Sequence, residues 1–152
     1  MRQYADILAF DRYGQLALIA EVKNKRVASS EWAAKMRRNM FAHGFLPNAP
    51  YFLLALPDRF YLWKNTGISL DVTEPTLEVD PRPFLEPYYE NSGILPDNLT
   101  ERSFEFIVTS WLNKVLRVRN SQDLLGKNQD WLVSSGLFDK LVGGNLEIEL
   151  AV

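Results

Sequence analysis

The stretch from Tyr4 to Lys25, YADILAFDRYGQLALIAEVKNK, contains two short apolar segments separated by a polar turn. Residues Ile7 to Phe10 and Leu16 to Val22 are rich in branched side chains and are too short for typical helices. The residues between them, Asp11 to Gly14, have the composition of a turn. The pattern therefore predicts a β-hairpin.

The register of this hairpin decides which side chains share a face. If the turn pairs Phe10 with Gln15, Asp6 lies opposite Ile19. Because side chains alternate along a strand, the face opposite to Asp6 then carries only apolar side chains: Ile7, Ala9, Leu16, Leu18, Ala20 and Val22. Since both faces are largely apolar, we expect two central strands that are covered on both sides.

Three charged side chains are expected to meet at one end of the hairpin. Glu21 and Lys23 are two residues apart in the second strand, so they share the face of Asp6. Carboxylate oxygens are the ligands that Mg²⁺ and Mn²⁺ prefer, and such a cation can activate water and stabilise charge on a phosphate. The ammonium of Lys23 could hold the attacking water or neutralise phosphoryl oxygens. The three groups could therefore form a metal-dependent catalytic site.

A purely structural interpretation stays open. Glu-x-Lys occurs by chance in many surface strands, where the ion pair contributes only a fraction of a kcal/mol. Lys23 could accordingly form a structural ion pair with Asp6 or Glu21. The surroundings favour the catalytic interpretation, because Glu21 follows the apolar run Leu16 to Ala20. A carboxylate in a buried strand requires a cation or hydrogen-bond donors to offset its desolvation.

The spacing of these residues resembles the motif of the PD-(D/E)xK nuclease superfamily, an Asp at the start of one strand and Glu-x-Lys on the next. The match here is Asp6, fourteen intervening residues and Glu21-Val22-Lys23, with Ala5 in place of the family's proline. The following helix and strands also resemble the nuclease-like domain at the N-terminus of type I restriction-enzyme motor subunits and its stand-alone relatives. The resemblance covers roughly residues 1–64.

This resemblance implies a restriction-endonuclease-like fold, an α/β domain with a mixed central β-sheet flanked by α-helices. It implies a DNA endonuclease, a hydrolase of phosphodiester bonds, with Asp6, Glu21 and the backbone carbonyl of Val22 as ligands of Mg²⁺ or Mn²⁺. Lys23 would orient the attacking water. Family members also have a helix, often with another acidic residue, and a strand before the motif Asp, whereas five residues precede Asp6 here.

Three explanations of this difference stay open. The chain could be truncated at its start, a later strand such as residues 145–152 could fill the place, or the site could be incomplete. The last possibility sustains a second hypothesis, a catalytically inactive nuclease-like module that binds a protein partner or nucleic acid.

The rest of the chain is expected to complete a single domain of residues 1–152, in which residues 1–65 hold the motif region. We expect a helix from Ser29 or Ser30 to about His43, which Gly44 ends. Two strands at residues 50–56 and 59–64, one or two helical turns around Trp131 and a final strand at residues 145–152 are also expected. An amphipathic helix is expected to start at Asp97 or Thr100, with its apolar side chains at helical spacing: Phe104, Ile107, Val108, Trp111, Leu112, Val115 and Leu116. Seven of the eight prolines lie between Pro50 and Pro96, so the segment 66–99 is predicted to be extended and irregular.

Contacts with nucleic acid are indicated only weakly. Lys25, Arg37 and Arg38 form a basic group that could touch DNA, although a solvated helix face is the commoner outcome. Tyr61 and Trp63 could stack on bases, but aromatic side chains more often cover a sheet. A net charge of −2 gives no general attraction for polyanions, so DNA-binding would depend on local patches.

The composition excludes several other classes of site. The chain has no cysteine and one histidine, His43, so thiolate and histidine-rich metal sites are unsupported. No apolar run approaches the length of about 18 residues that a membrane span requires. We therefore expect a cytoplasmic protein without a membrane partner, which could form a homodimer through the edge of its last strand.

Overall fold

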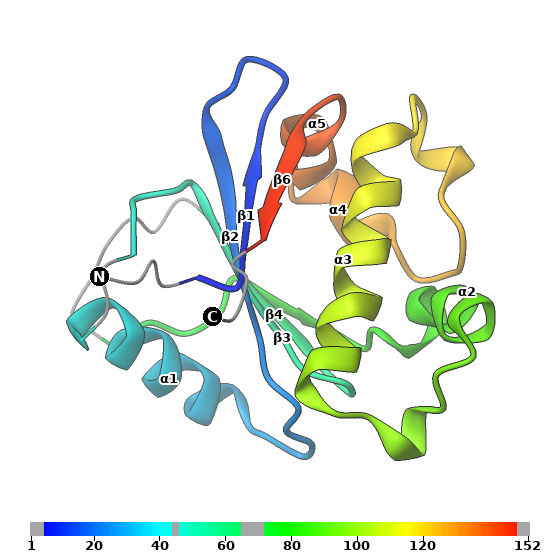
Figure 1. Ribbon diagram of the computed structural model, residues 1–152. Coiled ribbons are helices and arrows are strands. Elements are labelled where there is room, and N and C mark those ends of the chain that lie inside the picture. The colour runs from blue at the N-terminus through cyan, green and yellow to red at the C-terminus, as the bar shows by residue number, and fades with distance from the viewer. Residues whose placement is uncertain (1–4, 44–45, 65–71, 149–152) are drawn as a thin grey trace.

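The computed structural model describes residues 5–43, 46–64 and 72–148. This part of the chain forms an α/β fold around a mixed six-stranded sheet, as the sequence predicts. Figure 1 shows helix α1 on one face of the sheet and helices α2 to α5 on the other face. The sheet is therefore the middle of three layers.

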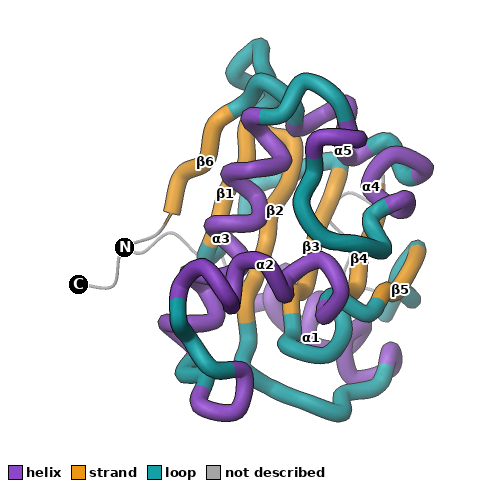
Figure 2. The backbone as a smooth tube through the Cα atoms, turned by 90° about the vertical axis from the view of Figure 1, so that its right-hand side faces the viewer, coloured by secondary structure: helices purple, strands orange, loops and turns teal. Residues whose placement is uncertain are grey.

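The strands follow the order β5-β4-β3-β2-β1-β6 across the sheet (Figure 2). Their bounds are β1 (Ile7–Phe10), β2 (Leu16–Val22), β3 (Tyr51–Ala55), β4 (Phe60–Lys64), β5 (Leu77–Val79) and β6 (Asn145–Ile148). Neighbouring strands are antiparallel except β2 and β3, which are parallel. A parallel pair needs a long crossover, and α1 (Ser30–His43) provides it.

The helices of the other face are α2 (Arg82–Ser92), α3 (Glu101–Arg117), α4 (Asp130–Ser134) and α5 (Leu137–Leu141). Two short 3₁₀ turns, η1 (Pro96–Asn98) and η2 (Ser121–Asp123), flank α3. The predicted helical turns around Trp131 are thus confirmed as α4 and α5. Among the described residues, no helix is long and apolar enough to cross a lipid bilayer.

The predicted crossover helix is confirmed as α1. Ser29 caps it, because its Oγ accepts a hydrogen bond from the backbone N–H of Trp32 at 3.1 Å. The partly buried hydrophobic side chains of α1 pack against the sheet: Trp32, Met36, Met40 and Phe41. Gly44, the expected end of the helix, lies outside the described residues.

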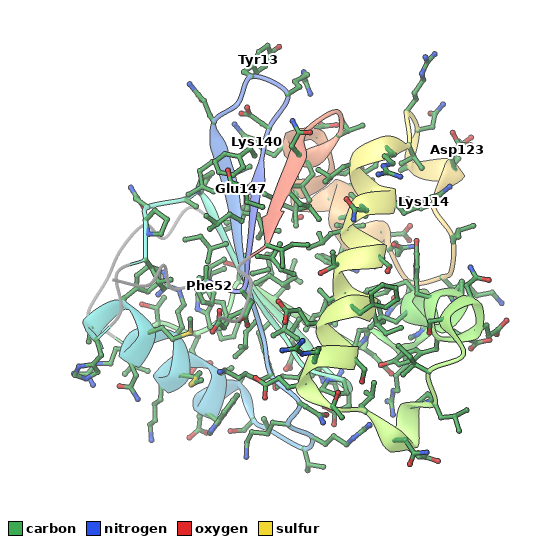
Figure 3. The ribbon with its side chains drawn as sticks, in the orientation of Figure 1. Tyr13, Phe52, Lys114, Asp123, Lys140 and Glu147 are labelled. Atoms are coloured by element: carbon green, nitrogen blue, oxygen red, sulfur yellow. The ribbon has the colours of Figure 1, made fainter. Side chains whose placement is uncertain are left out.

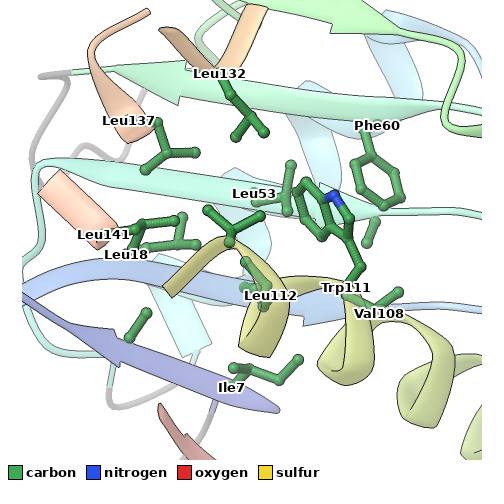
Figure 4. Close-up of a cluster of buried hydrophobic side chains, with 14 of the residues drawn as sticks. Ile7, Leu18, Leu53, Phe60, Val108, Trp111, Leu112, Leu132, Leu137 and Leu141 are labelled. Atoms are coloured by element: carbon green, nitrogen blue, oxygen red, sulfur yellow. The ribbon is translucent and has the colours of Figure 1, made fainter. Parts of the chain in front are cut away.

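Helix α3 forms the centre of the other layer. Thr100 caps it through a reciprocal pair of hydrogen bonds with Ser103, a capping box. All seven of its predicted core residues are buried: Phe104, Ile107, Val108, Trp111, Leu112, Val115 and Leu116. Figure 4 shows Trp111 and Leu112 among side chains of the sheet, α4 and α5. The Trp111 ring lies 5.5 Å from that of Phe60 on β4.

The hairpin register differs from the prediction at the turn. Asp11, not Phe10, pairs with Gln15, since the Asp11 N–H donates to the Gln15 carbonyl at 2.8 Å. The Asp11 carboxylate also accepts from the backbone N–H groups of Tyr13 and Gln15, at 2.9 Å each. Gly14 takes a left-handed conformation with φ of 82°, as the last residue of a three-residue loop. The predicted Phe10–Gln15 pairing is therefore wrong.

A β-bulge adds a second shift. Ala9 pairs with Leu18 but Phe10 pairs with Leu16, so Ala17 is an extra residue in β2. Leu16 consequently packs on the α1 side of the sheet. Ala17 takes the place on the α3 side that the predicted register gave to Leu16. Beyond the bulge, the observed pairs are shifted by two residues from the predicted register. The pair formed by Leu8 and Ile19 is an example.

The proline-rich segment is more regular than expected, because it contains β5 and α2. Pro83 lies in the first turn of α2, where proline is tolerated. Pro87 lies inside the helix and has no N–H to donate to the Pro83 carbonyl four residues earlier. The backbone N–H of Lys127 donates to this carbonyl instead, at 3.2 Å. The expectation of irregular chain is therefore wrong for Arg82–Ser92, and residues 65–71 lie outside the described chain.

Strand β6 lies at the edge of the sheet beside β1 and is antiparallel to it. Gly144 allows this approach, because a Cβ at this position would overlap the carbonyl oxygen of Phe10. The described part of the final strand ends at Ile148. The position beside β1 at this edge is thus occupied by a strand from the end of the described chain.

Truncation of Leu112 tests the packing of α3 on the sheet. Leu112 is fully buried, so Leu112→Ala should lower the free energy of unfolding by about 2–5 kcal/mol. Phe106 on the same helix is 56% exposed, and Phe106→Ala should change the free energy by about 0.5 kcal/mol or less. Urea denaturation monitored by circular dichroism measures both values. Equal effects would contradict the assignment of the buried face.

Candidate active site

The candidate site lies where β1 begins and β2 ends. The turn with exposed Tyr13 is at the other end of this hairpin (Figure 3). The β1–β2 ladder starts at Ile7, and continuing its register places Asp6 opposite Glu21, not opposite Ile19 as predicted. The predicted opposition was wrong because of the turn pairing and the bulge. The corrected register brings the two carboxylates closer together than the predicted one.

Two reciprocal hydrogen bonds join Asp6 to the end of β2. The backbone N–H of Val22 donates to Asp6 Oδ2 at 2.8 Å. The backbone N–H of Asp6 donates to Glu21 Oε1 at 2.9 Å. Each carboxylate thus accepts a bond from the backbone of the opposite segment. These bonds fix both carboxylates at the point where the regular ladder stops.

Burial strongly affects the ionisation of Glu21, which is only 8% exposed. Desolvation and then the negative charge of Asp6 raise the pKa of Glu21 to about 8. The hydrogen bond from the Asp6 N–H and the positive charge of Lys23 oppose this increase in pKa. Lys23 Nζ lies 3.9 Å from Glu21 Oε2. All three residues predicted for catalysis are therefore brought together.

The structure adds a third carboxylate beside this site. Glu101, the first residue of α3, has its Oε1 3.8 Å from Lys23 Nζ. Lys23 therefore lies between Glu21 and Glu101. In the family that the motif resembles, the helix that often carries an acidic residue precedes the motif Asp, whereas Glu101 lies on a helix that follows the hairpin. Nothing in the local sequence indicated that α3, which follows the hairpin, would reach the end of β2.

The donors at this site fit a hard divalent cation. Each of Asp6 and Glu21 uses one named oxygen for a backbone hydrogen bond, so each has a second oxygen. The N–H and C=O of one residue in a strand point to the same side, so the Val22 carbonyl faces Asp6 as its N–H does. The effect of Asp6 on the pKa of Glu21 indicates that a positive charge is favourable here. Within the described chain, no three Asp, Glu or His side chains form a group that could hold a metal ion.

Arg37 does not lie on a surface that could contact DNA, so its predicted role is wrong. It is only 1% exposed, and its guanidinium carbon lies 4.7 Å from the centre of the Phe41 ring. It also lies over the rings of Phe52 and Trp63. Ala33 is one turn earlier on the same face of α1, and its small side chain leaves space for the long Arg37 stem. Burial lowers the pKa of Arg37.

The other two basic candidates, Lys25 and Arg38, are exposed. Lys25 Nζ lies 5.2 Å from the centre of the Trp32 ring, near the start of α1. Arg38 Nη1 donates to Asn39 Oδ1 at 3.5 Å. Their contact with nucleic acid stays a prediction.

The aromatic residues of β4 cover the sheet and do not present rings for base stacking. Tyr61 is buried, and its hydroxyl donates to the carbonyl of Ala28 at 2.8 Å. Trp63 is also buried, and its Nε1 donates to the carbonyl of Thr73 at 2.8 Å. The structural interpretation of both residues is confirmed.

Comparison with known proteins gave no match: no family model, no curated protein and no solved structure matches the chain. The resemblance to the PD-(D/E)xK superfamily therefore stays a prediction from the motif.

The raised pKa of Glu21 predicts a particular dependence of stability on pH in EDTA. Native Glu21 keeps its proton up to a pKa of about 8, whereas the unfolded chain loses it near the ordinary value of 4.5. The stabilisation from this proton is complete below pH 4.5 and disappears as the pH rises through 8. The stability of the wild type relative to Glu21→Gln should thus fall by up to a few kcal/mol over this range.

Urea denaturation at a series of pH values measures this difference. Asp6→Asn is the matched control, because it removes the charge that repels ionised Glu21 and should reduce the pH dependence. A difference between wild type and Glu21→Gln that is constant with pH would contradict the burial of an ionisable carboxyl at this position.

Proposed function

We propose that the protein is a metal-dependent endonuclease that hydrolyses phosphodiester bonds in DNA. The observation that carries this proposal is the geometry at the end of β2. Asp6 and Glu21 are held together by reciprocal backbone hydrogen bonds, and the Lys23 ammonium lies 3.9 Å from Glu21. These residue types are the ones that hydrolysis of a phosphodiester with a divalent cation requires.

In this proposal Asp6, Glu21 and the carbonyl of Val22 hold Mg²⁺ or Mn²⁺. When bound, the cation lowers the pKa of water and stabilises negative charge on phosphate oxygens. The ammonium of Lys23 orients the attacking water or neutralises a phosphoryl oxygen. Glu101 acts as a positioning residue, because its carboxylate lies 3.8 Å from Lys23 Nζ and restricts where this ammonium can lie.

One observation favours the alternative, a catalytically inactive nuclease-like module that binds nucleic acid or a protein partner. Asp6 and Glu21 both accept backbone hydrogen bonds, and Lys23 is close to two carboxylates. A network of this kind can stabilise the junction of β1, β2 and α3 without any catalysis. Binding without cleavage would support this alternative.

Nicking of supercoiled plasmid in Mg²⁺ or Mn²⁺ tests the enzyme proposal. The wild type should nick DNA, and Glu21→Gln and Lys23→Ala should each reduce the rate by about 100-fold or more. Glu101→Gln should have a smaller effect, because Glu101 acts only through Lys23. Lys140→Ala is the matched control: it removes the same charge at an exposed position of α5, outside the candidate site, and its rate should remain within about threefold of wild type.

The rates of all variants should be measured at several DNA concentrations. The proposal predicts that Lys23→Ala lowers kcat more than it raises KM. Equal nicking by wild type, Glu21→Gln and Lys23→Ala would reject the assigned site, because the activity would come from elsewhere or from a contaminant.

Thermal unfolding tests the metal ligands independently of DNA. A ligand that binds only the native state stabilises it by about 2.7 kcal/mol at 100 times its Kd. MnCl₂ should therefore raise the Tm of the wild type at pH 8.5, where Glu21 is mainly ionised. Asp6→Asn and Glu21→Gln should show little increase, while Lys25→Ala should behave as the wild type does. The same Tm increase in all four proteins would contradict the ligand assignment.

A further inference from the structure

A cavity of about 450 Å³ opens beside α2. Its lining is mainly apolar and includes Tyr89 of α2 and the segment Ile94 to Pro96 that leads into η1. Pro57, after β3, lies on another side. This volume is within the range of natural ligand pockets, which are typically apolar with a few polar groups.

The same two chain segments form this cavity and hold the Lys23–Glu101 ion pair. Residues 23–26 follow β2, and residues 96–101 lead into α3. Three contacts join the segments: Lys23 Nζ to Glu101 Oε1 at 3.8 Å, Asn24 Nδ2 to the Leu99 carbonyl at 2.9 Å, and Arg26 Nη2 to the Pro96 carbonyl at 2.7 Å. The ion pair is at one end of this row, and the cavity is at the other. Three steps along the chain, from Lys23 to Arg26, span at most about 10 Å, a distance that one to three nucleotides cover.

The segment that follows β2 is fixed at further points. Val27 has φ of 58°, a strained conformation for a β-branched residue. Its backbone N–H donates to Asp58 Oδ2 at 2.9 Å. The carbonyl of the following residue, Ala28, accepts a hydrogen bond from the Tyr61 hydroxyl. Strain persists only where the surroundings determine the conformation. The chain next to Arg26, which lines the cavity, is therefore held by contacts within the protein.

The polar groups around the cavity determine which ligand fits. Glu86 and Glu90 lie one turn apart on α2, and ionised carboxylates only accept hydrogen bonds. Arg82 is paired with Asp80 at 2.8 Å, so its charge is balanced. Arg26 is the other basic residue of the lining, and its guanidinium donates to the Pro96 carbonyl. A ligand with flat apolar faces, an amino group at one edge and a phosphate near Arg26 satisfies all of these features.

We propose that this cavity binds an unpaired nucleobase of the DNA strand, one to three nucleotides from the phosphate that is cleaved. This inference rests on the proposed nuclease function and narrows its substrate to single-stranded or locally unpaired DNA. A paired base is stacked inside the duplex and enters a pocket only after it is extruded. The carboxylates favour cytosine, adenine or guanine, which carry exocyclic amino groups, over thymine, which carries none.

Fluorescence anisotropy in EDTA at pH 8 tests this proposal with the full chain and without cleavage. The probes are labelled 12-residue strands of dC, of dT and of abasic sugar-phosphate, and a blunt duplex of the same length. Single-stranded dC should bind at least tenfold more tightly than the abasic strand and the duplex, and at least threefold more tightly than dT.

Three variants assign the effect to the cavity. Tyr89→Ala should reduce the affinity for dC to that for the abasic strand. Glu90→Gln is at the surface and keeps the fold, and it should remove the preference of dC over dT. Tyr13→Ala changes an exposed tyrosine at the far end of the hairpin and should leave all affinities unchanged.

Equal binding of dC and abasic strands by the wild type would overturn the proposal, and so would tighter binding of the duplex. Free dCMP is the remaining probe: competition at micromolar concentration would assign the cavity to a free nucleotide and not to a strand. These outcomes are separate from plasmid nicking. Cleavage without base-dependent binding rejects the cavity, whereas base-dependent binding without cleavage supports the cavity and rejects the nuclease.

Discussion

The arrangement of the candidate site depends on one exchange of hydrogen bonds, in which two carboxylates accept the backbone N–H groups of each other's segments. β2 extends beyond the start of β1, so the Val22 N–H has no ladder partner there, and Asp6 Oδ2 accepts its bond. Glu21 does the same for the Asp6 N–H. A buried backbone donor without a partner is costly, so this exchange stabilises the end of the sheet. It also holds Glu21 in a buried place beside Asp6, where desolvation and then the negative charge of Asp6 raise the pKa of Glu21 to about 8.

The packing of α3 on the sheet brings a third carboxylate to the two that the hairpin provides. Its buried face fixes the helix against β4 and the two short helices α4 and α5, so the position of its first residue is also fixed. That residue is Glu101, which lies beside Lys23. The segment that enters α3 contacts the segment that leaves β2, and the cavity beside α2 lies against this contact. Core packing, the charged site and the cavity are thus parts of one connected arrangement.

The α1 side of the sheet contains a charged side chain within its core. Arg37 is surrounded by the rings of Phe41, Phe52 and Trp63, and cation–π contacts with several rings offset part of its desolvation. The expected basic group is thereby divided: Arg37 is buried, and Lys25 and Arg38 are exposed. Arg37 is therefore not available on the surface, whereas Arg26 lines the cavity beside α2.

The sequence by itself determined the elements whose signals are local. Apolar periodicity and capping residues predicted α1, α3 and the hairpin, and the spacing of Asp6, Glu21 and Lys23 predicted that they would meet. Only the tertiary structure decided the register, because the Asp11 turn and the bulge at Ala17 depend on specific hydrogen bonds. Helix α2 was missed because the N–H that replaces the one absent at Pro87 comes from Lys127, forty residues away. The place of Glu101 beside Lys23 was missed for the same reason: contacts between distant segments are set by how helices pack on the sheet, and no local pattern encodes them.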